Sequence, residues 1–108
     1  MARHYLNTTL DAVRILGLQL ASARREQRRT STEVAERAGI TRVTLTQVER
    51  GEPSVAIGIY FEVAMVLAVP IFGADSRELA EMAARSERDL AVLPRRVRQR
   101  TVTIDDDF

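Results

Sequence analysis

The sequence predicts an all-α fold of five helices followed by a short tail, and three observations support this prediction. Apolar residues recur at intervals of three and four between residues 10 and 90, which is the spacing of one helix face. Residues that cap helix starts precede several of these runs. Glycine or proline stands where the runs end. The 108 residues suffice for one domain with a modest core, which we place at residues 1–93.

The first helix is expected to begin at Thr8 or Thr9, because Thr8 and Asp11 are spaced like a capping pair. Its apolar face is formed by Leu10, Val13, Leu16, Leu20 and Ala23. Positive charge suits the carboxyl end of a helix dipole. Four arginines are accordingly expected in its last turn, namely Arg24, Arg25, Arg28 and Arg29.

The second and third helices are expected to be short and joined by a tight turn. Thr30 with Glu33 repeats the capping pattern, and Gly39 ends the second helix, because glycine adopts the left-handed conformation at little cost. Thr41 caps a third helix over residues 42–50, which Gly51 closes. The inward-facing residues of this pair are Val34, Ala35, Ala38, Ile40, Leu45 and Val48.

Two further helices complete the domain, whose core is predicted at residues 10–69. A fourth helix is expected at 56–68 and ends before Pro70. Its common apolar face is formed by Ile57, Tyr60, Phe61, Ala64 and Leu67. Asp75 and Glu78 predict the cap of an added fifth helix at residues 75–90. Its apolar stripe is formed by Leu79, Met82, Ala83 and Leu90.

The tail, residues 94–108, is first basic and then acidic. Its β-branched run from Thr101 to Ile104 favours a strand, and an isolated strand needs an edge to pair with. We expect Val102 and Ile104 to pair antiparallel with the same segment of a second subunit, and Phe108 to be available to a partner protein. The alternative is a disordered tail, in which case Leu79 and Met82 of the fifth helix form the dimer alone.

Composition excludes several classes of protein. There is no cysteine, which fits a reducing cytoplasm, and no apolar run approaches the roughly 18 residues of a membrane span. His4 is the only histidine, and no base is placed to activate a hydroxyl nucleophile. We therefore expect a cytoplasmic, nucleoid-associated protein that is not an enzyme and has no cofactor and no metal site.

Charge is unevenly distributed, although the net charge is only +1. Residues 1–30 carry six arginines against Asp11 and Glu26, and the chain contains no lysine. A GC-rich genome explains the absence of lysine most simply. Arginine nevertheless offers planar, multi-donor contacts to phosphate and guanine. The arrangement of the side chains, rather than the net charge, must therefore decide whether the chain binds nucleic acid.

The second and third predicted helices form a helix-turn-helix, whose third helix has a polar outward face. The residues expected to read bases are Arg42, Val43, Thr46 and Gln47. Arginine pairs with both guanine acceptors, glutamine pairs with adenine, and valine contacts the thymine methyl group. The residues expected to contact phosphates are Ser31, Thr32, Thr41, Thr44 and Arg50. A merely solvated helix would also be polar, but the turn, the spacing and the flanking helices together favour double-stranded DNA.

The run STEVAERAGITRVTLTQVERGEPSVAIGIYFEVAMVLAV resembles the Xre family of Cro- and lambda-repressor-type DNA-binding domains, and the resemblance covers residues 14–69. It implies a lambda-repressor-like fold, sequence-specific DNA binding, and a pair between Arg24 and Glu49. The chain departs from the family at two positions. Ser31 stands where a DNA-contacting glutamine is common. Arg29 stands where an apolar residue is usual, and there we expect an added phosphate contact.

The segment GEPSVAIGIYFEVAMVLAV and the closing LPRRVR…DDDF resemble a subgroup, the HipB-type antitoxins, which are encoded beside HipA-type kinase toxins. This resemblance implies a homodimeric, autoregulating repressor that also binds a toxin. Two alternatives stay open: a stand-alone Xre-type regulator with no toxin, and a helix-turn-helix adaptor that binds protein instead of DNA. Arg42 and Gln47 on the reading face argue against the adaptor.

Overall fold

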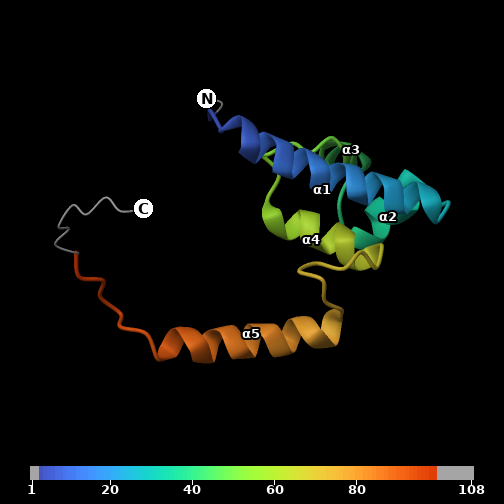
Figure 1. Ribbon diagram of the computed structural model, residues 1–108. Coiled ribbons are helices and arrows are strands. Elements are labelled where there is room, and N and C mark those ends of the chain that lie inside the picture. The colour runs from blue at the N-terminus through green and yellow to red at the C-terminus, as the bar shows by residue number, and fades with distance from the viewer. Residues whose placement is uncertain (1–2, 100–108) are drawn as a thin grey trace. The chain divides into compact units, whose positions relative to one another are not determined.

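A computed structural model describes residues 3–99, and in this part of the chain the secondary structure is five α-helices (Figure 1). They are α1 (Asn7–Glu26), α2 (Ser31–Ala38), α3 (Arg42–Glu49), α4 (Ile57–Val66) and α5 (Ser76–Ala91). The all-α prediction is therefore confirmed. The chain divides into two compact units, Met1–Gly73 and Ala74–Phe108. The predicted strand at 101–104, with Val102, Ile104 and Phe108, lies outside the described residues.

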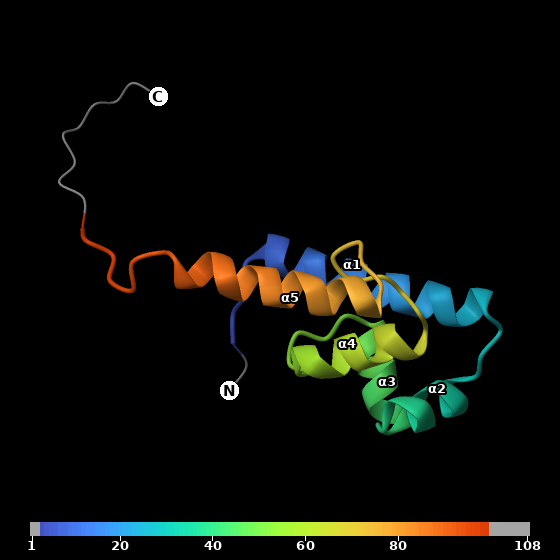
Figure 2. The ribbon, with the colours of Figure 1, turned by 90° about the horizontal axis from the view of Figure 1, so that it is seen from below.

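The first unit is a small bundle in which α2, α3 and α4 gather on one side of α1 (Figure 2). Each helix contributes apolar side chains to one core, which removes them from water and holds the short helices together. The buried members are Leu20, Val34, Ala35, Ala38, Leu45, Val48, Tyr60, Val63, Ala64 and Leu67. None of the helices among residues 3–99 is long and apolar enough to cross a membrane.

Side-chain caps fix three of the helix starts. The Thr30 hydroxyl accepts a hydrogen bond from the backbone N–H of Glu33 at 3.1 Å, and the Thr41 hydroxyl accepts one from Thr44 N–H at 3.1 Å. The Asp75 carboxylate accepts from the backbone N–H of Glu78 at 2.8 Å, and Glu78 Oε1 accepts in return from the Asp75 N–H at 3.1 Å. These three predicted caps are confirmed.

The start of α1 differs from the prediction. The helix begins at Asn7, its cap residue is Leu6, and no side chain caps it. The Leu6 carbonyl accepts the N–H of Leu10 at 3.1 Å, so Thr8 lies inside the first turn. The expected cap at Thr8 with Asp11 is therefore wrong, because the helix extends one turn further toward the N-terminus than its apolar face does.

The inward face of α4 is rotated relative to the prediction. Ile57 was expected in the core but is 63% exposed, whereas Val63 is fully buried. The buried row runs through Tyr60, Val63, Ala64 and Leu67. The helix is apolar nearly all round, so its sequence pattern alone does not select one face.

Two polar side chains from the α1–α2 connection hold the carboxyl end of α4. Gln27 Nε2 donates to the Leu67 carbonyl at 2.7 Å, and Arg29 Nη1 donates to the Val66 carbonyl at 2.8 Å. Arg29 Nε also donates to Glu33 Oε1 at 2.9 Å. These bonds satisfy carbonyls that a helix end leaves without partners. The Arg29 side chain is only 17% exposed, so the expected phosphate contact at this position is not supported.

The loop between α3 and α4 is fastened by Tyr60. Its hydroxyl donates to the Glu52 carbonyl at 2.7 Å. Burial, assisted by the negative charge of Glu52, raises the pKa of Tyr60 to about 12, so the phenol stays protonated and able to donate. The chain that leaves α3 is thereby held against the core of the first unit.

The second unit consists of α5 and the residues around it. The helix has an apolar stripe and a charged remainder, and none of its residues is buried. Leu79 and Met82 are half-buried, and Leu90 is 70% exposed. An amphipathic helix of this kind is suited to packing its apolar stripe against another surface.

Candidate nucleic-acid interface

The turn between α2 and α3 has the backbone geometry expected of a helix-turn-helix. Gly39 adopts the left-handed conformation at φ 70°, which a side chain would disfavour. The N–H of Ile40 donates to the Ala35 carbonyl at 2.9 Å and closes the end of α2. Leu45 and Val48 are buried and hold α3 on the core. One side of α3 therefore packs inward while the other remains open.

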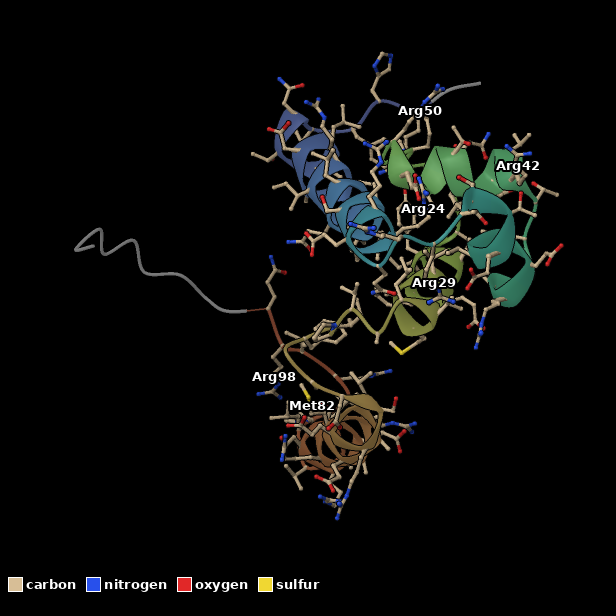
Figure 3. All side chains as sticks on the ribbon, turned by 90° about the vertical axis from the view of Figure 1, so that its right-hand side faces the viewer. Arg24, Arg29, Arg42, Arg50, Met82 and Arg98 are labelled. Atoms are coloured by element: carbon tan, nitrogen blue, oxygen red, sulfur yellow. The ribbon has the colours of Figure 1, made fainter. Side chains whose placement is uncertain are left out.

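The outward side of α3 carries all four predicted base-reading residues. Arg42, Val43, Thr46 and Gln47 are all exposed. Val43 is 69% exposed, which is unusual for a valine in a small domain and leaves its methyl groups available for contact. Figure 3 shows Arg42 and Arg50 at opposite ends of α3. The structure thus brings the predicted reading residues together as one exposed row.

Hydrogen bonds restrict what the threonines can offer to a ligand. The Thr46 hydroxyl donates to the Arg42 carbonyl at 3.0 Å, so its methyl group and oxygen lone pairs remain available. The Thr41 and Thr44 hydroxyls lie 3.0 Å apart, and Thr41 also caps α3. One hydroxyl proton is shared within this pair, which leaves the other free to donate outward.

A groove between α1, α2 and α3 adds a residue that the sequence analysis did not assign to the site. Ser31, Thr46 and Arg50 all line it, together with Arg25 from the last turn of α1. Its other lining residues are Leu18, Ala21, Ser22, Arg24 and Glu49. From the sequence, Arg25 is expected only as a charge suited to the helix dipole. Its position next to Arg24 was the available signal, because Arg24 faces α3.

Arg24, labelled in Figure 3, forms with Glu49 the ion pair that the family resemblance implied. Arg24 Nε donates to Glu49 Oε2 at 2.6 Å, and Nη2 donates to Oε1 at 3.0 Å. A third bond runs from Nη1 to the Arg29 carbonyl at 3.0 Å. Both side chains are 13% exposed, and the hydrogen bond to Glu49 raises the pKa of Arg24. This bidentate ion pair, which lies mostly out of water, fixes the end of α3 relative to α1.

Two glycines allow α1 and the end of α3 to approach closely, which the sequence analysis missed. A Cβ atom at Gly17 would lie 2.5 Å from the Val48 carbonyl oxygen. A Cβ atom at Gly51 would lie 2.5 Å from the Cα of Arg14, and Gly51 also has a φ of +72°. Backbone therefore meets backbone at this crossing, and the position of the reading helix depends on both glycines.

The sequence comparison identifies the family of the chain. A helix-turn-helix family model matches residues 20–73, which is half of the chain and contains α2, α3, α4 and most of the core. The chain belongs to this family. The helix-turn-helix protein is accordingly of the Xre and lambda-repressor type and is a DNA-binding transcription regulator. Neither a curated protein nor a solved structure matches it.

Proposed function

We propose that this helix-turn-helix protein is a sequence-specific repressor that binds double-stranded operator DNA as a homodimer in the cytoplasm, on the nucleoid. The observation that supports this most strongly is the row of Arg42, Val43, Thr46 and Gln47 along α3. The row projects from a helix held at one end by the Thr41 cap and at the other by Glu49. A rigidly held helix with such a face is suited to the major groove.

Each reading residue has a matching base. Arg42 can donate two hydrogen bonds to the N7 and O6 acceptors of guanine, and Gln47 can pair with N6 and N7 of adenine. Val43 offers a methyl surface to thymine. Because the Thr46 proton is used within α3, its outward contact is its methyl group or an accepted hydrogen bond. The half-site is therefore expected to contain guanine, thymine and adenine contacts in that order along α3, from Arg42 through Val43 to Gln47.

The phosphate contacts are proposed to flank this row. Ser31 and Thr32 lie in the first turn of α2, and Thr41 and Thr44 lie at the start of α3, where backbone N–H groups and hydroxyls favour anions. Arg50 stands at the opposite end of α3 and is exposed. Such contacts position the protein on the duplex but do not select a sequence.

Dimerisation is proposed because one helix-turn-helix unit covers little DNA surface, and dimers of such units bind two half-sites about 10 bp apart. The stripe of α5 with Leu79 and Met82 is the proposed dimer surface among the described residues. Val102 and Ile104 are proposed to add a strand pair, and Phe108 to contact a partner. These last three residues lie outside the described part of the chain.

Arg42→Ala is expected to weaken binding to the cognate operator by about 1–3 kcal/mol and to relax the preference at one base pair. The reason is the loss of two hydrogen bonds to one guanine. The operator is first selected from a pool of random duplexes by the unaltered protein. Affinities for that duplex and for its single-base variants are then measured by gel-shift titration.

Arg50→Ala is the matched control, because it removes the same side chain from the other end of the same helix. It should weaken binding to duplexes of every sequence to the same extent. It should also reduce the steepness of log affinity against log salt concentration by about one. Unchanged operator affinity in Arg42→Ala would show that the reading face is assigned wrongly. Selection of no duplex at all would favour the protein-binding adaptor.

A narrower proposal is that this repressor is the autoregulating antitoxin of a HipA-type kinase toxin. The resemblance of residues 51–69 to HipB-type antitoxins supports it. We expect the reading frame beside the gene of this chain to encode a kinase-like protein that co-purifies with the chain and arrests growth without it. A neighbouring product that is not kinase-like, or that fails to co-purify, would leave a stand-alone regulator.

A further inference from the structure

The groove between α1, α2 and α3 carries more positive charge than its own side chains neutralise. Its volume is about 420 Å³, far more than the roughly 30 Å³ that one water molecule occupies. Its charged lining residues are Arg24, Arg25, Arg50 and Glu49, and we call it the arginine groove. Arg24 binds both carboxylate oxygens of Glu49. The one acid of the arginine groove is therefore already paired, and two guanidinium groups have no counter-charge there.

These two guanidinium groups come from different helices. Arg25 stands in the last turn of α1, and Arg50 directly follows α3. Both residues are exposed, and within residues 3–99 neither takes part in an ion pair. Like charges that line one groove repel each other, and an anion placed between them removes this repulsion. Because a guanidinium group donates several hydrogen bonds in one plane, it suits the oxygens of a phosphate.

The row of base-reading residues on α3 indicates the source of this phosphate. Thr46 of that row lines the arginine groove, and so does Ser31 at the start of α2. We propose that the arginine groove receives the backbone of one operator strand, with Arg25 on the α1 side and Arg50 on the α3 side. Arg25 is then a positioning residue that anchors α1 on the DNA. This inference rests on the proposed function and deepens it by adding a contact from α1.

A contact from α1 restrains the angle at which the reading helix lies on the DNA. The Arg24–Glu49 pair and the close backbone contact at Gly17 join α1 to α3. A phosphate held by Arg25 therefore limits the rotation of α3 about its own axis, which contacts from α3 alone restrain less. Phosphate contacts fix the orientation of a protein on the duplex and carry no sequence information. Arg25 is thus expected to act equally on duplexes of every sequence.

Arg25→Ala is expected to lower the affinity for the selected operator, and for its single-base variants, by the same factor of about ten. It should reduce the steepness of log affinity against log salt concentration by about one, and the double variant with Arg50→Ala should reduce it by about two. Gel-shift titrations at several salt concentrations measure both effects. Because Arg25 is exposed, the variant should fold normally, and Arg25→Gln, which keeps a long polar side chain, should show the same losses.

Arg14→Ala is the matched control. Arg14 is an exposed arginine of the same helix, lies about three helical turns from Arg25, and does not line the arginine groove. Its replacement removes the same charge from the protein and should leave the steepness unchanged. An equal reduction in Arg14→Ala and Arg25→Ala would mean that only the total charge matters, which would overturn the proposed contact.

Uncharged phosphates locate the contact on the DNA. Operator duplexes are prepared with a single methylphosphonate at each backbone position in turn. At one position the replacement should weaken binding of the unaltered protein but not of Arg25→Ala, and this position should coincide with, or adjoin, the one found with Arg50→Ala. Positions further apart, or unchanged affinity and salt dependence in Arg25→Ala, would overturn the inference while operator binding stands. If the unaltered protein binds no duplex, the proposed function fails, and the contact of Arg25 fails with it.

Discussion

Glu49→Ala is expected to lower the free energy of unfolding by about 3–5 kcal/mol. Removal of this carboxylate leaves the Arg24 guanidinium mostly out of water without its counter-charge, and a buried charge with no partner is costly. Only the bond from Arg24 Nη1 to the Arg29 carbonyl would remain. Urea unfolding followed by circular dichroism measures the loss. We also expect weaker operator binding, because the pair orients the end of the reading helix.

Glu33→Ala is the matched control for this prediction. Glu33 also pairs with an arginine, but its side chain is 48% exposed, so its loss should cost less than about 1 kcal/mol. A double-mutant cycle over Arg24→Ala and Glu49→Ala separates the coupling between the two side chains from their other contacts. If Glu49→Ala lowers the free energy of unfolding no more than Glu33→Ala does, the burial of the Arg24–Glu49 pair does not make it more stabilising than an exposed pair.

The parts of the fold that the sequence predicted are those governed by local chemistry. The caps at Thr30, Thr41 and Asp75 each act within three residues, and the left-handed turn at Gly39 depends on that residue itself. The inward positions Leu45 and Val48 follow from helical spacing. The exposed row on α3 follows equally, since a residue that is not on the buried side of a short helix must face outward.

The parts that could not be predicted depend on partners distant in the sequence. The Arg24–Glu49 pair spans 25 residues, and family resemblance rather than spacing pointed to it. Arg29 reaches a carbonyl 37 residues away, and Gln27 reaches one 40 residues away. Every residue has a backbone carbonyl, so the residue types in the sequence do not show which carbonyl accepts such a bond. The second role of Arg25, in the groove beside α3, also depends on how α1 and α3 pack, and its position next to Arg24 was the one signal of it in the sequence.

The two helical glycines are the clearest case of a role that depends on distant partners. The largest steric effect that we predict concerns one of them. Gly17 and Gly58 both lie inside helices, in α1 and α4, and their sequence contexts do not distinguish their roles. A Cβ atom at Gly17 would lie 2.5 Å from the Val48 carbonyl oxygen and 2.7 Å from the nitrogen of Gly51. At Gly58, nothing outside the neighbouring helix backbone lies within 4 Å of the added atom.

The same substitution is therefore expected to have opposite effects at the two positions. Gly17→Ala should lower the free energy of unfolding by about 3 kcal/mol or more, because two backbones must move apart and neither can change rotamer to relieve the contact. Gly58→Ala should raise it by a few tenths to about 1 kcal/mol, because alanine loses less conformational entropy in a helix. Parallel urea titrations measure both. Equal effects at the two sites would mean that α1 and α3 do not approach as closely as described. A Gly17→Ala protein that still folds at low temperature should also bind its operator less tightly, since the crossing that it widens sets the position of the reading helix.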